Sequence, residues 1–195
     1  MTTTTEAPPH DGAWFDALFA AHAAAVHRYF VRRLATSRDD AEDLAAEVLA
    51  TAWRRRDDVP VGGELPWLYR TAGYVLANHR RKARALPVAA VPEEPDDVDP
   101  AELALDDDRV RAVLARLSAR DRRVLLLVAW DGLGGDDLAA VLGVSRGGAD
   151  AALSRARARL RTAWSEAEQD DDQTGAPPGG DRTADGAARA ANDEA

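Results

Sequence analysis

The stretch GLGGDDLAAVLGVSRGGADAALSRARARLR (residues 132–161) decides the fold. Apolar residues recur at helical spacing in two blocks, first Leu133, Leu138, Ala139 and Leu142, and then Leu153, Leu160 and Trp164. Between the blocks, Gly143 can adopt the left-handed backbone conformation that joins two helices at a steep angle. Ser145 follows as a candidate N-cap for the second helix. The spacing therefore predicts a helix-turn-helix over residues 134–160.

The outward face of the second predicted helix carries small residues followed by arginines. At about 100° per residue, six side chains point away from the apolar stripe: Ala151, Ala152, Ser154, Arg155, Ala158 and Arg159. Such a face can approach a DNA major groove closely while its arginines neutralise phosphates. The same pattern is compatible with an ordinary helical hairpin whose basic face is solvated.

Composition favours an all-α protein and excludes several kinds of site. Helix-forming Ala, Leu, Arg and Glu abound. The absence of cysteine excludes disulfides, thiolate zinc sites and a cysteine nucleophile. The N-terminus lacks the basic start and apolar run of a signal peptide, and no stretch approaches the roughly 18 apolar residues of a membrane span. We therefore expect no membrane insertion.

The net charge of −9 is unevenly distributed. Residues 86–108 carry nine acids and no base, and residues 166–195 carry nine acids against two arginines. The rest of the chain holds 23 of the 25 bases and 16 of the 34 acids, a net charge of +7. This distribution suits a nucleic-acid partner better than the acidic total suggests.

Periodicity and punctuation divide the chain into segments. Helices are expected at about 14–34, 37–56, 65–85, 108–117, 118–130, 136–142 and 145–167. Residues 86–108 are rich in proline and acid and cannot bury a core, so we expect a flexible linker there. The predicted organisation is a disordered N-terminus (1–11), a first helical domain (12–85), the acidic linker (86–108), a helix-turn-helix domain (109–166) and a disordered acidic tail (167–195).

A second basic cluster lies on the third long helix, at Arg70, Arg80, Arg81, Lys82 and Arg84. The same helix carries Trp67, Tyr69 and Tyr74. Aromatic rings beside arginines suit an unpaired strand, because a base can stack on a ring while the backbone is neutralised. In the alternative interpretation, the rings belong to the core and the bases to a solvated helix end.

The second long helix has an acidic side, formed by Asp40, Glu42, Asp43 and Glu47. This side could face solvent, dock a basic protein partner or carry carboxylate catalysis. None of the four histidines lies at metal-ligand spacing with these acids, and no glycine-rich phosphate loop is present. We therefore expect no enzymatic activity, no metal and no cofactor.

Three blocks together resemble a known family: DAEDLAAEVLATAWRR (40–55), ELPWLYRTAGYVLANHRRKARA (64–85) and LSARDRRVLLLVAWDGLGGDDLAAVLGVSRGGADAALSRARARLR (117–161). They are similar to bacterial RNA polymerase sigma factors of the extracytoplasmic-function (ECF) type in the sigma-70 family, and VLANHRR resembles actinobacterial members. That family has regions 2 and 4 joined by a variable linker, which is the organisation expected above.

The resemblance implies roles for three sets of residues. The second helix is expected to dock on the β′ clamp helices of core polymerase through Asp40, Glu42, Asp43, Leu44, Glu47 and Trp53. The loop at 57–64 and the third helix are expected to read and open the −10 element through Glu64, Trp67, Arg70, Tyr74, Asn78, Arg80, Arg81 and Lys82. The last helix is expected to enter the major groove of the −35 element through Ser145, Arg146, Ala151, Ser154, Arg155, Arg157 and Arg159.

Several positions depart from the family pattern. Asp150 stands where a base is usual and Ala152 where an arginine is usual, which predicts weak or unusual −35 recognition. Ala46 replaces a common Gln in the docking helix. Tyr74 replaces a common Asn and could stack on a base instead of hydrogen-bonding to one.

The resemblance implies a promoter-recognition subunit that directs core polymerase to specific promoters and promotes DNA opening. It also implies a cytoplasmic, monomeric protein with an anti-sigma factor as a further partner. Two alternatives remain open: a helix-turn-helix regulator that works without polymerase, and a helical adaptor that binds polymerase without initiating transcription.

Overall fold

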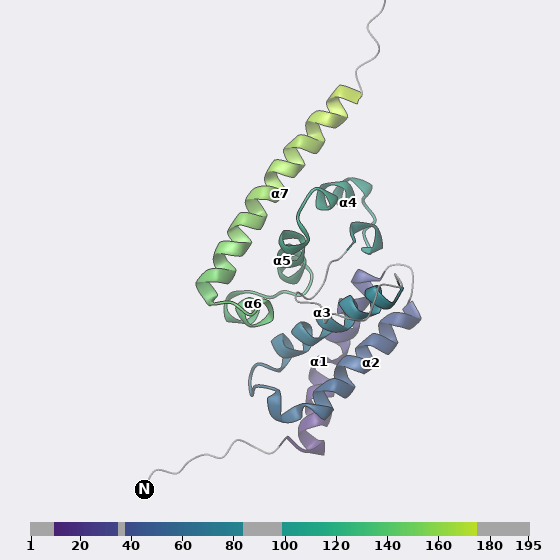
Figure 1. The fold of residues 1–195 in the computed structure, drawn as a ribbon, viewed down its shortest axis with the longest axis vertical. Coiled ribbons are helices and arrows are strands. Elements are labelled where there is room, and N and C mark those ends of the chain that lie inside the picture. The colour runs from purple at the N-terminus through teal and green to yellow at the C-terminus, as the bar shows by residue number, and fades with distance from the viewer. Residues whose placement is uncertain (1–9, 35–37, 84–98, 175–195) are drawn as a thin grey trace, which may run out of the picture.

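The computed structural model describes residues 10–34, 38–83 and 99–174. Within these ranges the secondary structure is helical, without a strand, which confirms the predicted all-α class (Figure 1). The α-helices are α1 (Gly12–Arg33), α2 (Arg38–Arg54), α3 (Glu64–Ala83), α4 (Asp108–Ala115), α5 (Ala119–Ala129), α6 (Gly135–Leu142) and α7 (Arg146–Thr174). Two short 3-10 helices, η1 (Arg56–Asp58) and η2 (Pro100–Glu102), lie in the connections.

Local side-chain chemistry sets the ends of the helices in the second half of the chain. The Ser118 hydroxyl accepts a hydrogen bond from the backbone N–H of Asp121 at 3.2 Å, so it caps α5. Gly143 ends α6 with a φ of 67°, in the left-handed region. The Ser145 hydroxyl then accepts from the N–H of Gly148 at 3.2 Å and caps α7. The helix-turn-helix boundaries therefore follow from the sequence.

The first three helices form a bundle. α1 packs against α2 and α3, and α2 packs against α3 (Figure 1). The most deeply buried apolar side chains of this bundle are Val26, Tyr29, Phe30, Val48, Leu68 and Leu76. On α3 the buried stripe includes Leu68 and Leu76, whereas Trp67 is half-buried at its edge.

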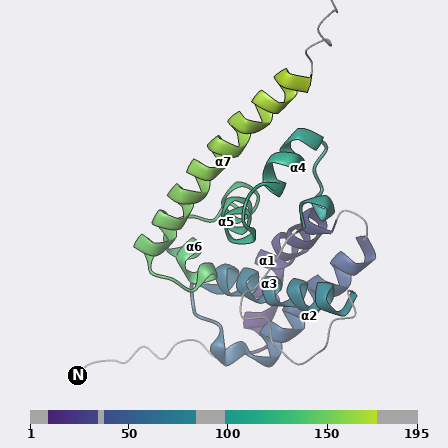
Figure 2. The same cartoon turned by 45° about the horizontal axis from the view of Figure 1, so that its top comes forward.

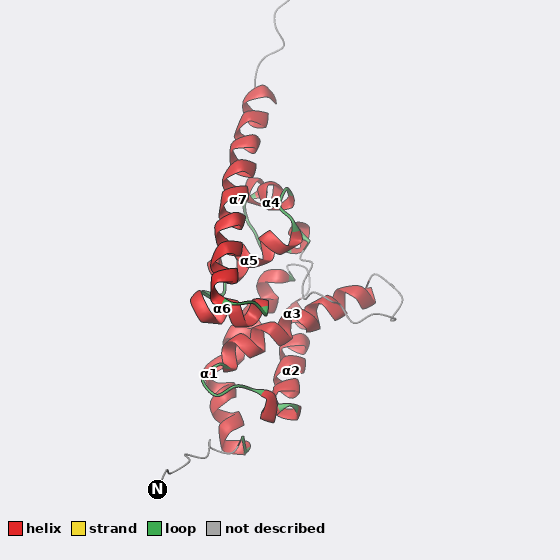
Figure 3. Ribbon diagram, turned by 60° about the vertical axis from the view of Figure 1, so that its left-hand side comes forward, coloured by secondary structure: helices red, strands yellow, loops and turns green. Residues whose placement is uncertain are grey.

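A second bundle is built on the long helix α7, against which α4, α5 and α6 pack (Figures 1 and 3). The buried side of α7 is a row of alanines: Ala149, Ala152, Ala156, Ala163 and Ala167. Small side chains allow neighbouring helices to approach closely. The larger residues that the spacing placed in this stripe, Leu153, Leu160 and Trp164, are half-buried and border a cavity of about 380 Å³.

The predicted end of the last helix near residue 167 is wrong, because α7 continues to Thr174. Acids that the sequence assigned to a disordered tail bind arginines of α4. Glu168 lies 3.4 Å from Arg109 and accepts a hydrogen bond from the Trp164 indole at 2.9 Å, and Asp170 pairs with Arg116 at 2.6 Å. These contacts hold the added turns of α7 against the bundle. The remainder of the predicted tail, 175–195, lies outside the described residues.

The interpretation of 86–108 as a flexible linker needs correction over its last part. Asp99 caps η2 by accepting a hydrogen bond from the N–H of Ala101 at 2.9 Å, and Leu103 is buried at 1% exposure. The N–H of Ala104 donates to the carbonyl of Arg32 on α1 at 2.9 Å. Residues 99–107 therefore form a packed strap, while 86–98 lie outside the described residues.

The two bundles share a hydrophobic core, a contact that the predicted division into two linked domains did not include. α6 lies against α3 (Figures 1 and 2). Six buried residues from the second bundle join the core of the first: Leu127, Leu133, Leu138, Ala139, Val141 and Ala149. A separate core cluster holds α4, α5 and α7 together.

Candidate nucleic-acid interface

The exposed face of α7 is the part of the predicted DNA interface that the structure presents most openly. Ala151, Ser154, Arg155, Arg157 and Arg159 are all exposed, as are Ser145 and Arg146 at the start of the helix. At about 100° per residue, the small residues form the centre of this face and the arginines its edges. A narrow, basic-edged helix face of this kind fits a DNA major groove.

Ala152 does not belong to this face, contrary to the sequence-based assignment. Its side chain is 8% exposed and packs in the core between α5 and α7. An arginine at this position would have to leave the core, so Ala152 is explained by packing. Asp150 is exposed on α7, where its negative charge would repel a phosphate.

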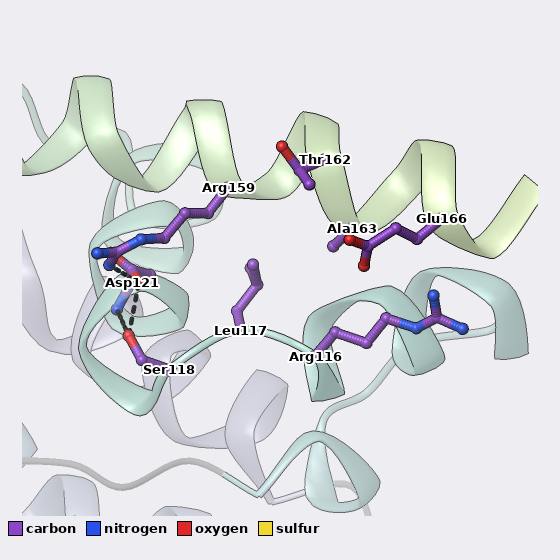
Figure 4. A pocket seen from close by; sticks show the side chains of 8 residues that line it. All are labelled: Arg116, Leu117, Ser118, Asp121, Arg159, Thr162, Ala163 and Glu166. Carbon is purple, nitrogen blue, oxygen red and sulfur yellow. Dashed lines mark hydrogen bonds and ion pairs between the residues drawn. The ribbon is translucent and has the colours of Figure 1, made fainter.

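Arg159 is tied to α5 and is thereby less available to DNA. Its guanidinium donates to Oδ2 of Asp121 at 2.5 Å, and both side chains line a cavity of about 430 Å³ between α7 and the α4–α5 turn (Figure 4). The Ser118 hydroxyl donates to the same carboxylate oxygen at 2.5 Å. Burial alone raises the pKa of Asp121, but the hydrogen bonds from Ser118 and Arg159 and the nearby charges of Arg159 and Arg120 bring the pKa below its usual value. Asp121 is therefore ionised and anchors α7 at its middle.

Arg146 is paired within the helix-turn-helix. Its guanidinium lies 3.0 Å from the carboxylate of Asp136 on α6, and both side chains are exposed. An exposed pair of this kind is worth little, so Arg146 can exchange Asp136 for a DNA phosphate at small cost.

The predicted −10 residues follow α3 but do not form a uniformly open surface. Arg70 and Lys82 are exposed, whereas Glu64, Trp67, Tyr74, Asn78 and Arg81 are half-buried. Arg81 donates to the side-chain oxygen of Asn78 at 2.9 Å, and Glu64 accepts from the N–H of Gly62 at 3.0 Å in the adjacent loop. Trp67 and Tyr74 therefore keep only part of their surface accessible.

Arg80 departs from its predicted role. Its side chain is 6% exposed, and its Nε donates to Glu102 of the strap at 2.7 Å. Its Nη2 donates to the carbonyl of Arg33 on α1 at 2.9 Å. In this arrangement Arg80 joins three segments of the chain instead of facing a nucleic acid. Arg84, the last base of the predicted cluster, lies outside the described residues.

The acidic side of α2 is a solvent-facing surface. Glu42, Asp43 and Glu47 are exposed, and Asp40 is half-exposed beside His79, 3.7 Å away. Leu44, predicted to contact polymerase, instead lies in the core at 7% exposure. Its side chain packs α2 against the core of the first bundle.

Trp53 ends this surface with an aromatic patch. Trp53 is 41% exposed, and its ring contacts Phe15 of α1 edge-on at 5.3 Å. The Arg56 guanidinium lies 5.1 Å above the Trp53 ring. Phe19 of α1 extends the patch and is 51% exposed. The sequence had placed Trp53 at a docking surface but gave no sign that α1 contributes to it.

Two further features of the described ranges are the grouping of possible metal ligands and the length and apolar character of the helices. In those ranges, His, Cys, Asp and Glu side chains form no cluster suited to a metal ion. Nor does any described helix have the length and apolar character to cross a membrane.

Comparison with known proteins identifies the family. The description "Sigma-70 region 2" matches residues 18–86, which include most of the first bundle, and "Sigma-70, region 4" matches residues 107–160 in the second. The RNA polymerase sigma-E factor of Streptomyces coelicolor is 33% identical over 67% of this chain and 75% of its own length. The chain belongs to the ECF RNA polymerase sigma factors. The predicted family is therefore confirmed.

Other relatives agree with this assignment. The ECF RNA polymerase sigma factor SigE of Mycolicibacterium smegmatis is 30% identical over 75% of this chain and 60% of its own length. Among solved structures, CnrH in complex with the cytosolic domain of CnrY is 28% identical, with a TM-score of 0.52 over 83% of this chain and 91% of that one. The sigma factor RpoE of Bartonella quintana, bound to the anti-sigma factor NepR, shares the fold at 24% identity and a TM-score of 0.53, over 76% of this chain and 95% of that one.

Proposed function

We propose that this sigma factor directs core RNA polymerase to specific promoters and promotes the opening of promoter DNA. One observation carries the proposal: the two matched regions present different surfaces, an acidic one on α2 and a basic-edged one on α7. A protein that bridges a polymerase and DNA needs both. We further propose a cytoplasmic, monomeric protein without catalytic activity, since the polymerase supplies the chemistry.

The −35 element is read in this proposal by the N-terminal half of α7. Arg155 and Arg157 neutralise phosphates at the edges of the groove, while Ala151 and Ser154 allow the helix to approach the bases. Among the proposed −35 residues only the arginines can form bidentate contacts to bases, and Arg146 and Arg159 are already paired with carboxylates. We therefore propose that affinity at −35 comes mainly from phosphate contacts, with limited base discrimination.

The −10 element is read by α3 and by the loop that precedes it. Trp67 and Tyr74 are half-buried aromatic residues on which an unpaired base can stack, and the exposed Arg70 lies between them along α3 to neutralise the strand. Lys82 adds a further exposed positive charge near the end of the helix. Stacking is worth about 1–3 kcal/mol per base, which is the order of the few kcal/mol needed to unstack one base. Binding of two or three bases can thus hold the opened strand.

Core polymerase is the proposed partner of the acidic surface on α2. Exposed carboxylates at Glu42, Asp43 and Glu47 complement a basic surface, such as one on the β′ clamp helices. Trp53 supplies an aromatic anchor at the end of the same surface. An anti-sigma factor is a second proposed partner, because the similar sigma factor RpoE was solved in complex with the anti-sigma factor NepR.

Run-off transcription tests the proposal. The protein is mixed with core polymerase and a genomic promoter library, and the products are sequenced. Initiation at defined sites that requires both protein and core supports a sigma factor. Specific duplex binding without any effect on core supports an independent regulator, and core binding without initiation supports an adaptor.

A pair of variants separates docking from general surface charge. Asp43→Ala with Glu47→Ala removes two acids from the proposed docking surface, and we expect core affinity to fall by about tenfold or more. Asp16→Ala, an exposed acid on α1, is the matched control and should leave core affinity unchanged. Equal effects of the two changes would contradict the proposed docking surface.

A further inference from the structure

The two bundles are joined by a buried ion pair that neither promoter reading nor polymerase docking uses. Arg33, at the end of α1, lies 2.6 Å from Asp131 in the α5–α6 turn, and the two side chains are 1% and 2% exposed. The Arg33 guanidinium also stacks on the Tyr29 ring, 3.7 Å from its centroid, and donates to the Tyr29 carbonyl at 3.2 Å. The turn between α5 and α6 is thereby fixed to α1.

Four further hydrogen bonds surround this pair. Arg32 donates to the carbonyl of Trp130 in the same turn. The strap residue Ala104 donates to the carbonyl of Arg32, and Arg80 joins the carbonyl of Arg33 to Glu102. The C-terminus of α1 is therefore the point at which region 2, the strap and region 4 meet.

The helix-turn-helix itself lies on the proposed −10 helix. α6 packs against α3 and buries Leu138 and Val141 in the common core. The guanidinium of Arg70, a proposed −10 residue, lies about 3.5 Å from where a side chain on Gly143 would begin. The turn that orients α7 thus occupies part of the surface proposed to read −10.

Distances on DNA show that this arrangement cannot read both promoter elements. Elements centred near −10 and −35 lie about 25 base pairs apart, or roughly 85 Å along B-form DNA at about 3.4 Å per pair. Two packed helices have axes only about 8–10 Å apart, and here α6 of the helix-turn-helix packs on α3. The bundles would have to separate by tens of ångströms to contact both elements.

We propose that the free protein is autoinhibited by this contact, with the Arg33–Asp131 pair and the Arg80–Glu102 pair as its polar locks. The inference rests on the proposed function for its consequence, but the closed arrangement itself is a property of the free chain. Opening separates Arg33 from Asp131 and exposes both charges to water, where each is hydrated. Removing one partner instead leaves the other charge buried and uncompensated in the closed form, which favours opening.

Distance measurements on the free full-length chain test the proposal. The protein contains no cysteine, so spin labels can be placed at Ala24→Cys on α1 and Ala140→Cys on α6, both exposed. Double electron–electron resonance should give a single, narrow distribution of short distances between the two spin labels when the rest of the chain is unchanged. A broad or long distribution in the parent would overturn the proposal.

Two lock variants and a control give the test its specificity. Asp131→Asn should raise the fraction of long distances by about tenfold or more, and Glu102→Gln should produce a smaller rise. Asp170→Asn, which alters the Arg116 pair inside region 4, should leave the distribution unchanged. Unchanged short distances in both lock variants, with helix content by circular dichroism equal to the parent, would overturn the locks.

Glu102→Gln keeps the test valid if Asp131→Asn fails to fold, because Glu102 is partly exposed on the strap. Addition of core polymerase separates this inference from the proposed function. Lengthening of the distance by core supports both. Lengthening by the lock variants but not by core supports the closed arrangement and contradicts polymerase as the partner that opens it.

Discussion

At the residue scale, the carboxylate of Asp121 combines several interactions that the sequence did not indicate. Its carboxylate accepts from Ser118 on one side and from Arg159 on the other. The pKa of Asp121 lies below its usual value although burial opposes ionisation, because these donors and the charge of Arg120 outweigh burial. A folded-state pKa below the unfolded one means that its stabilisation is present above about pH 4 and is lost as pH falls through the folded pKa.

Asp121→Asn should therefore lower the free energy of unfolding at pH 7 by about 1–3 kcal/mol and flatten its decline in acid. Urea titrations at pH 7, 4 and 3 measure both effects. Asp170→Asn is the control, because the Asp170 side chain is 64% exposed and an exposed pair is worth under about 1 kcal/mol. An equally steep acid decline in Asp121→Asn and the parent would show that Asp121 does not titrate as proposed.

Gly143 is a second residue-scale case, because its φ of 67° is costly for other residues. Gly143→Ala should destabilise the protein by about 1–2 kcal/mol, and Gly143→Asn by less, since Asn tolerates this conformation better. Denaturant midpoints measure both. Space is not the cause, because the nearest atoms to an added side chain belong to the Arg70 guanidinium at ordinary contact distance. Equal stability of the Ala and Asn variants would point to a different cause.

Residue roles were predictable from sequence where partners are local. Gly143 and Ser145 act within three or four residues, so spacing alone identified them. Arg80 and Arg159 were assigned to DNA as basic side chains, and the groups that they bind in the structure were not foreseen. The partners of Arg80 lie 22 and 47 residues away in sequence, and the partner of Arg159 lies 38 residues away. Spacing along a helix contains no information about such distant carboxylates and carbonyls, so only the folded arrangement revealed them.

At the scale of the element, α7 combines two tasks along its length. Its N-terminal half presents Arg155 and Arg157, and within the described residues neither makes an ion pair. Its C-terminal half is held by Glu168 and Asp170 against α4. The periodicity predicted the helix as far as about residue 167, but the last turns of α7 were assigned to the tail, because acids and few bulky residues are also typical of disorder.

Arg155→Ala with Arg157→Ala should weaken binding of random-sequence duplex DNA and reduce the slope of log affinity against log salt by about 2, one unit per lost phosphate contact. Fluorescence anisotropy at several salt concentrations measures the slope. Arg28→Ala on α1 is the matched control, since Arg28 is exposed but lies outside the proposed interface. A slope that does not change in the double variant would mean that these arginines do not contact phosphates.

Arg159→Ala has a different expected result because of Asp121. Its loss leaves a nearly buried carboxylate with one fewer donor, so stability should fall as well as DNA affinity. The comparison of Arg159→Ala with the Arg155 and Arg157 double variant therefore separates anchoring of α7 from DNA contact. A loss of DNA affinity without any change in the urea midpoint would assign Arg159 to DNA alone.

At the scale of the whole molecule, the sequence indicated two domains and the structure joins them through one core. Leu138 lies on the apolar side of α6 that periodicity identified, and Val141, which periodicity did not assign to that side, is buried as well. Periodicity does not show which surface covers that side, and here it is α3 of region 2. The proline- and acid-rich composition of residues 86–108 favoured a flexible linker, yet within that range Leu103 is buried and Glu102 pairs with Arg80 of α3. The family and the helices were thus readable from sequence, whereas the relation between the regions was not.

Because regions 2 and 4 share core residues, we expect the stability of α3 to depend on the packing of α6. Leu138 is 1% exposed in the cluster common to α3 and α6, whereas Leu114 is 7% exposed in the separate cluster of region 4. Either leucine changed to Ala should cost about 2–5 kcal/mol. In hydrogen exchange resolved by peptide, Leu138→Ala should increase exchange in α3 as well as in α6, because packing that stabilises one stabilises the other. Leu114→Ala should increase exchange in α4, α5 and α7 and spare α3. Unchanged exchange of α3 in Leu138→Ala would show that region 2 is stable without the helix-turn-helix, and the closed arrangement would then contribute nothing to its folding.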